Sequence, residues 1–192
     1  MKLHKYENYD EYVKEQTQAN VAKLKNVWVR ENAIQKVVSY KPFASSILCH
    51  GTRNGRELEY FKKFLPHAEV VGTEISHTAT QFKNTVQHDF HEVREDFVGK
   101  FDIVYSNSFD HAYDPSKAIL AWKDQLTTDG VLVIELMTGV ENISRPVDPL
   151  EINYEEFKEL AEKNGLRVLE KNIMHRQMSV SYTHLTLPTR AQ

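Results

Sequence analysis

The sequence has one cysteine, no long apolar run and no excess of basic residues, and each of these shortages excludes a class of protein. The single cysteine, Cys49, excludes an intramolecular disulfide and a zinc site built from several thiolates. The longest apolar run, Val131 to Met137, contains Glu135 and is too short to span a membrane. A net charge of -3 at pH 7 disfavours a broad phosphate-binding surface, so we do not expect nucleic acid as a partner.

The rest of the composition, 41% hydrophobic and 27% charged, is that of an ordinary globular protein. A length of 192 residues predicts a single domain, which we place at residues 1–180, with residues 1–40 as a helical N-terminal cap. No N-terminal stretch combines basic residues with an apolar core, so we expect no signal peptide and a cytoplasmic location. The oligomeric state stays open.

Short apolar runs alternate with helical segments along the chain. We expect strands at residues 45–49, 69–73, 85–87, 101–106, 131–136 and 166–172, and a turn at 129–130. Helices are expected at residues 9–25, 27–40, 56–64, 77–83 and 154–163, and one opens at Pro115. This alternation indicates βαβ units, and the apolar strands indicate a sheet that is covered on both faces. We therefore predict an α/β three-layer sandwich with a mainly parallel sheet, helices on both faces and N-terminal helices.

The end of the chain, residues 181–189, resembles a peptide found at the ends of reading frames from environmental sequencing, where it is translated adapter or vector sequence. We therefore expect residues 181–192 to be a non-native tail and the native chain to continue past Val180. The alternative is an ordinary strand, since the composition of residues 182–187 suits a strand.

Two glycines, Gly51 and Gly55, follow the first strand of the predicted sheet. Open α/β sheets bind ligands at the carboxyl ends of their strands, and glycine lets the backbone turn sharply against a ligand. Taken alone, this spacing also fits a tight connection between strand and helix.

Two acids strengthen the case for a ligand. Glu74 ends the second strand, where a carboxylate can accept both hydroxyl protons of a ribose, and Asp89 ends the third, where it can accept from an adenine amino group with Phe90 beside the ring.

The ordered motifs at residues 47–55, 74, 89–90 and 101–107 are similar to those of the class I S-adenosylmethionine-dependent methyltransferases, and residues 108–115 and 130–134 resemble the later motifs of that superfamily. The similarity covers roughly residues 45–172. It implies a Rossmann-like fold, S-adenosyl-L-methionine as cofactor and methyl transfer to a small or medium-sized acceptor. By position the resemblance assigns the methionine part of the cofactor to Gly51, Thr52, Arg53 and Gly55, and the ribose to Glu74. It assigns the adenine to Asp89 and Phe90, and the flanks of the sulfonium to Ser106 and Asn107.

Two residues depart from the pattern of the superfamily, which usually has an acid at the position of Cys49 and a glycine at that of Arg53. A thiol cannot replace a carboxylate as acceptor for the cofactor's ammonium, whereas Arg53 can grip the cofactor's carboxylate. These departures leave open a non-catalytic cofactor-binding or structural partner subunit. A further alternative, an NAD-dependent oxidoreductase, is disfavoured because that family needs Gly-x-Gly-x-x-Gly and does not explain Asp89 and Phe90.

Methyl transfer needs orientation of the reactants more than it needs reactive side chains, and a base helps only where the acceptor carries a proton of high pKa. His111, just beyond the fourth strand, is the candidate catalytic residue, expected to contact or deprotonate the acceptor. The alternative is a histidine at a helix entry that bonds to the backbone. We expect no metal site, because His88 and His91, which bracket Asp89, point different ways on an extended segment. We expect residues 138–152 to line the acceptor site. The N-terminal helices, with Tyr6, Tyr9 and Tyr12, either cover this site as a lid or pack on the sheet as amphipathic helices.

Overall fold

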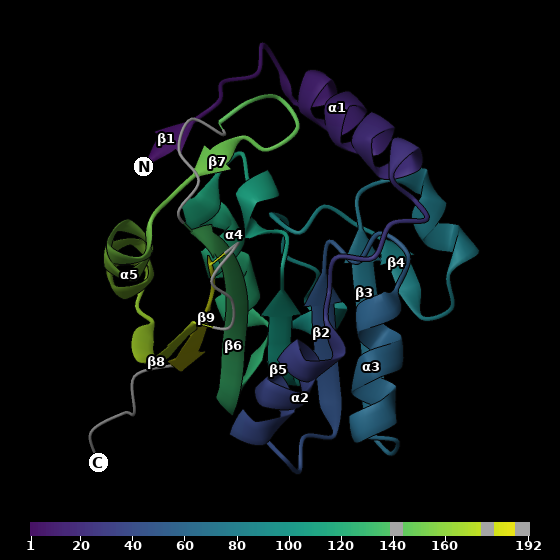
Figure 1. Ribbon diagram of the computed structural model, residues 1–192, viewed down its shortest axis with the longest axis vertical. Coiled ribbons are helices and arrows are strands. Elements are labelled where there is room, and N and C mark those ends of the chain that lie inside the picture. The colour runs from purple at the N-terminus through teal and green to yellow at the C-terminus, as the bar shows by residue number, and fades with distance from the viewer. Residues whose placement is uncertain (139–143, 174–178, 187–192) are drawn as a thin grey trace.

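The computed structural model describes residues 1–138, 144–173 and 179–186, and a seven-stranded sheet forms its centre (Figure 1). The strands lie in the order β4-β3-β2-β5-β6-β9-β8, and those from β2 to β6 are mutually parallel, while β9 runs antiparallel between β6 and β8. The mainly parallel sheet is therefore confirmed. The strands span Ser46–His50 (β2), Glu69–Glu74 (β3), Thr85–Gln87 (β4), Phe101–Ser106 (β5), Leu126–Thr138 (β6), Arg167–Ile173 (β8) and Ser179–Thr186 (β9).

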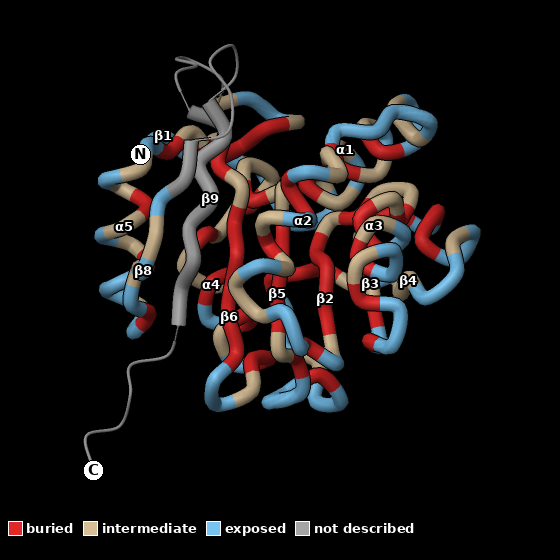
Figure 2. Tube along the Cα trace, turned by 60° about the horizontal axis from the view of Figure 1, so that its bottom comes forward, coloured by how far each residue is buried: buried red, intermediate tan, exposed pale blue. Residues whose placement is uncertain are grey.

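Helices cover both faces of the sheet, as the sequence predicts. Successive strand residues point to opposite faces, so Ile47 packs in one apolar cluster with Phe61, whereas Leu48 packs in another with Trp122. In Figure 2 the tube of β2, β5 and β6 is mostly red, the colour of buried residues. Full burial of one such side chain contributes about 1.5–3 kcal/mol, and these two clusters form the core. The covering helices are α2 (Glu31–Tyr40) and α3 (Arg56–Phe64) on the first face, and α4 (Pro115–Asp124) and α5 (Tyr154–Lys163) on the second.

The first helix, α1 (Tyr9–Ala22), lies across the carboxyl edge of the sheet instead of on a face (Figure 1). Its Gln16 side chain donates to the carbonyl of Val147 at 3.0 Å, and its Asn20 side chain accepts from Thr78 at 2.8 Å, so the helix is tied at both sides of that edge. Of the helical cap expected over residues 1–40, α1 therefore covers the edge, while α2 belongs to the sandwich. Two short strands, β1 (Lys2–Leu3) and β7 (Leu150–Glu151), pair beside it.

Three expected elements differ from the structure. The predicted turn at residues 129–130 lies inside β6, whose register against β5 is irregular there; a Cβ at Gly130 would come within 2.8 Å of the Phe101 carbonyl oxygen, so the close approach of the strands needs glycine. The helix expected at residues 77–83 is a 3-10 helix, η1 (His77–Gln81). The helix expected from residue 27 begins only at Glu31.

Residues 181–186 belong to β9, and residues 187–192 lie outside the described residues, so the foreign origin of this tail stays a prediction. Two further 3-10 helices are η2 (Glu95–Phe97) and η3 (Phe109–His111). Among the helices that the structure describes, none has the length and apolar character needed to cross a membrane.

Candidate functional site

The strand order reverses between β2 and β5, because the chain builds β3 and β4 on one side of β2 and then returns to its other side. Ligands of open α/β sheets bind at such a switch point. Two cavities lie there, which we call the large cavity, of about 680 Å³, and the small cavity, of about 50 Å³. The two share a wall and are compartments of one site; the lining residues common to both are Lys23, Gly51, Arg53, Ser108 and His111.

The turn after β2 forms this shared wall. Gly51 has a φ of +69°, and a Cβ there would lie 2.6 Å from the Cβ of Ser108, so only glycine fits. Arg53 also has a positive φ, +46°, a conformation that favours glycine and costs on the order of 1–3 kcal/mol for other residues. Its backbone N–H donates to Glu74 Oε2 at 3.0 Å, which helps to hold the strained turn. Arg53, which stands where the superfamily usually has a glycine, is therefore a strained residue on the wall of the site.

Both expected ligand-binding acids line the small cavity. Glu74 is buried, and its other oxygen, Oε1, accepts from the backbone N–H of Ser76 at 3.1 Å. Asp89 Oδ2 accepts from the Tyr9 hydroxyl at 2.8 Å, and Oδ1 lies 2.6 Å from His91 Nδ1. Burial opposes the charged form of Asp89, but the hydrogen bonds from His91 and Tyr9 lower the pKa of this carboxyl. Phe90 lines the same cavity, so the three residues come together as expected, but Asp89 is already engaged by α1.

The large cavity gathers Thr52, Arg53, Asn107 and His111 from the predicted set. Of the remaining predicted residues, Gly55 and Ser106 line neither of the two cavities. Gly55 has a φ of +71° and opens α3, and the Ser106 hydroxyl is buried and donates to the His50 carbonyl at 3.2 Å. These two residues shape the backbone behind the site.

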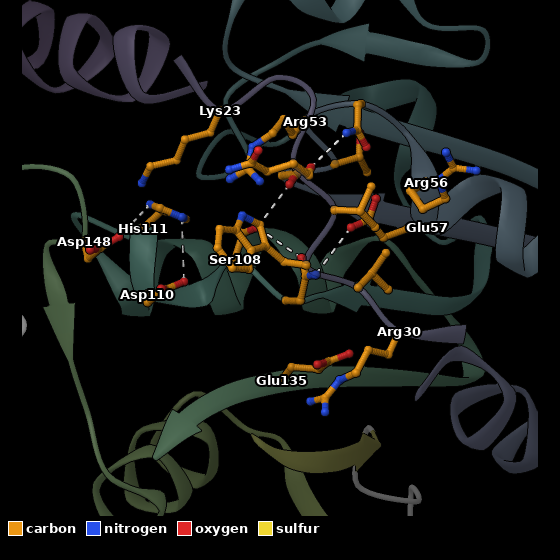
Figure 3. Close-up of a pocket in the computed structure, with 18 of the residues that line it drawn as sticks. Lys23, Arg30, Arg53, Arg56, Glu57, Ser108, Asp110, His111, Glu135 and Asp148 are labelled. Carbon is orange, nitrogen blue, oxygen red and sulfur yellow. Dashed lines mark hydrogen bonds and ion pairs between the residues drawn. The ribbon is translucent and has the colours of Figure 1, made fainter. Parts of the chain in front are cut away.

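Charged side chains that sequence reasoning missed also line the large cavity, and they come from five separate segments of the chain (Figure 3). Arg145 and Asp148 lie in the segment that was expected to line the acceptor site, whose residues 139–143 are outside the described residues. The missed residues are Lys23, Arg30, Arg56, Glu57, Asp110, Glu135, Arg145 and Asp148.

His111 lies between two carboxylates on the wall of the large cavity (Figure 3). Its Nδ1 lies 2.7 Å from the carbonyl of Val147, so Nδ1 donates this hydrogen bond and Nε2 takes no part in it. Asp148 Oδ1 is 3.9 Å from Nδ1, and Asp110 Oδ1 is 4.0 Å from Nε2. Burial raises the pKa of Asp110. His111 bonds to the backbone, as expected for a structural histidine at a helix entry. It also lines the large cavity, as a residue that contacts the acceptor must.

Asp110, His111 and Asp148 place one possible metal-ligand atom each within 4.8 Å of one another. Asp148 is, however, paired with Arg145 at 2.5 Å, and Nδ1 of the histidine is taken by a carbonyl. The expectation of no metal stays a prediction.

His50, the last residue of β2, is a packing residue: its ring nitrogens bond to Thr73 and Gln125 at 2.8 and 2.7 Å, and burial lowers its pKa to about 3.

Comparisons with known proteins agree with this geometry. Residues 48–134 match the family model of a methyltransferase domain, which agrees with the predicted superfamily and enzyme class. A comparison with proteins of curated function found no sequence match.

Among solved structures, the chain is similar to Burkholderia thailandensis 1,6-didemethyltoxoflavin-N1-methyltransferase, solved with 1,6-didemethyltoxoflavin and S-adenosylhomocysteine bound. The TM-score is 0.77 at 15% identity, over 96% of this chain and 93% of that one. It is also similar to a Haloferax volcanii protein solved in complex with the Trm112 methyltransferase activator (TM-score 0.72, 14% identity, 95% and 100% covered). A third is magnesium protoporphyrin IX methyltransferase from Synechocystis with bound S-adenosylmethionine (0.65, 11%, 96% and 100%). At these identities the likeness shows the fold, which is the expected Rossmann-like sandwich.

Proposed function

We propose that this chain, which carries a methyltransferase domain of the class I superfamily, transfers a methyl group from S-adenosylmethionine to a small or medium-sized acceptor held in the large cavity. The observation that carries the proposal is this cavity of about 680 Å³ at the switch point of the sheet, within the 300–1,000 Å³ usual for ligand sites. It joins the glycine turn, Asn107 and His111 in one space. Bound there, the cofactor would supply an activated methyl group, and the protein would supply position and charge.

The residues at the site fit the methionine end of the cofactor better than its adenosine end. Gly51 leaves backbone accessible beside the methionine part, and Arg53 offers a guanidinium for its carboxylate. Glu74 has lone pairs left for the ribose hydroxyls, since each of its oxygens accepts one backbone hydrogen bond. The adenine would take the side of Asp89 and Phe90. The small cavity, of about 50 Å³, is far below the roughly 300–1,000 Å³ usual for ligand sites, so adenosine can enter only if α1 moves.

His111 is the residue proposed to act on the acceptor. Its Nδ1 is fixed by the Val147 carbonyl, and this leaves Nε2 to accept a hydrogen bond or a proton from the acceptor atom. Asp110 and Asp148 on either side would stabilise the imidazolium that a proton transfer creates. Cations and anions both line the cavity, which suits a polar acceptor.

Calorimetric titration of the purified protein with S-adenosylmethionine, S-adenosylhomocysteine and NAD tests this proposal. We expect both adenosyl ligands to bind and NAD not to bind. Preferential binding of NAD, or no binding of any of the three by folded protein, contradicts it. Binding of S-adenosylhomocysteine without methyl transfer to any acceptor in a broad screen would instead favour the non-catalytic subunit.

A further inference from the structure

Glu57 is a buried carboxylate that the expected roles do not use. It lies in the first turn of α3, is 7% exposed and lines the large cavity (Figure 3). Its Oε1 accepts from the side-chain amide of Asn107 at 3.3 Å, but its Oε2 has no hydrogen-bond partner among the residues that the structure describes. A buried carboxylate oxygen without a partner is costly, and a ligand with a cationic N–H group would remove that cost.

The surroundings of Glu57 are those of a site for a group of mixed charge. Arg53, from the turn, lines the same cavity and favours the charged form of Glu57, whereas Glu135, from β6, disfavours it. Burial outweighs these and raises the pKa of Glu57 to about 7. A carboxylate and a guanidinium on one cavity wall match the two charges of an α-amino acid group, which carries an ammonium and a carboxylate on one carbon.

The position of Glu57 also accounts for Cys49. The thiol of Cys49 is fully buried and packs in the apolar cluster between the sheet and α3. Burial, and after it the charge of Glu57, raise the pKa of this thiol. The negative charge missing from the end of β2 is therefore present nearby, on the first turn of the next helix.

We propose that Glu57 accepts the ammonium of the cofactor's methionine part, while Arg53 binds the carboxylate of the same group. This assignment rests on the proposed function. The acceptor is the other possible source of a cation, but Glu57 bonds to Asn107 and, in Figure 3, lies on the opposite side of Ser108 from His111. The carboxylate therefore belongs to the cofactor's part of the cavity.

The test uses two ligands that differ in the amino acid group. S-adenosylhomocysteine contains it, and 5′-methylthioadenosine keeps the adenosine and the sulfur but lacks it. We expect Glu57→Gln to weaken binding of S-adenosylhomocysteine roughly 10- to 100-fold, the range for a hydrogen bond to a charged group, and to leave methylthioadenosine unchanged. Glu59→Gln, on the same helix with a side chain that is 62% exposed, is the matched control and should change neither affinity.

A second variant guards against loss of the fold. Arg53→Gly removes the guanidinium and suits the positive φ of this position, so the variant should fold and should again weaken binding of S-adenosylhomocysteine alone.

A third readout is the number of protons released when the ligand binds. Near pH 6.5 the wild type should release protons when S-adenosylhomocysteine binds, because neutral Glu57 ionises beside the ammonium, and Glu57→Gln should release fewer. Calorimetry in buffers of different ionisation enthalpy measures this.

The outcomes are distinct. An unchanged affinity of Glu57→Gln for S-adenosylhomocysteine, or an equal loss for both ligands, overturns the role of Glu57 while the proposed function stands. If folded wild-type protein binds neither ligand, the proposed function fails and this inference fails with it.

Discussion

The large and the small cavity share a wall, yet they differ in volume and in the elements that line them. The ends of the strands and charged side chains of both signs bound the large cavity, which is open at about 680 Å³. The small cavity measures about 50 Å³, and Tyr12, Gln16 and other α1 residues line it together with Glu74 and Asp89. If the proposed function is right, the methionine end of the cofactor enters a large cavity, and the adenosine end enters one that is too small for it and is lined by α1. Binding of adenosine is thus coupled to movement of α1, and the two cavities should respond to different substitutions.

The largest expected effect concerns the acceptor side. His111→Ala should lower turnover about 100-fold or more, the usual contribution of a positioned acid or base, and should leave the affinity for S-adenosylhomocysteine nearly unchanged. Formation of S-adenosylhomocysteine with any acceptor that supports turnover measures this. His88→Ala is the control, since His88 Nε2 bonds to the Glu92 carbonyl away from both cavities. Full turnover by the His111 variant would reduce this residue to a structural role.

The second effect is a pH dependence of stability that comes from Glu57 in the large cavity. Its pKa is raised from 4.5 to about 7 in the folded protein, so the neutral carboxyl stabilises the fold below pH 4.5, and this contribution is lost as the pH rises through 7. The shift corresponds to about 3 kcal/mol. Urea unfolding of the wild type between pH 4.5 and 8 should show this loss, and Glu57→Gln should show a correspondingly flatter profile. Equal slopes for the two proteins would contradict the raised pKa of Glu57 and the burial that causes it.

The third effect tests the small cavity. Glu74→Ala should weaken binding of S-adenosylhomocysteine and of methylthioadenosine alike by ~1.5–3 kcal/mol, because both ligands contain the ribose. This equal loss would separate Glu74 from Glu57, whose substitution should affect only one ligand. Since Glu74 also holds the backbone of Arg53 and Ser76, melting temperatures must accompany the titrations. An unchanged affinity would mean that the ribose lies elsewhere.

The smallest expected effect comes from α1. Tyr9→Phe removes the hydrogen bond to Asp89, so the helix should leave the small cavity more easily and adenosyl ligands should bind more tightly by about 0.5–1.5 kcal/mol. Stopped-flow binding should show the gain mainly as faster association. Tyr60→Phe is the control, because Tyr60 lies on α3 and packs against the apolar cluster of Ile47 and Phe61. Weaker binding by the Tyr9 variant would indicate that Tyr9 contacts the ligand instead of blocking it.

Local signals predicted much of the fold. The expected bounds of β5, α3 and α5 agree with the structure, because each element ends at a residue whose chemistry is local. In α5, for example, Asn153 caps the helix and Glu156 returns the bond to form a capping box. The two-residue strands β1 and β7 carry no such signal, since they form by pairing with each other although about 150 residues separate them in the chain.

The site was predictable where it follows strand ends and was not where it depends on packing. Gly51, Glu74 and Asp89 come in the expected order because parallel strands bring their carboxyl ends to one edge. Glu57 looks in sequence like an ordinary acid in the first turn of a helix, where it favours the helix dipole, and only the packed structure shows its burial. The contact between Tyr9 and Asp89 spans 80 residues and had no sequence signal.

A crystal structure with S-adenosylhomocysteine bound tests the central claim that the two cavities hold the two ends of one cofactor. The account predicts the ammonium at Glu57, the ribose at Glu74, and the adenine beside Asp89 and Phe90 with Tyr9 displaced from Asp89. Adenosine in the large cavity, with α1 still bonded to Asp89, would contradict it.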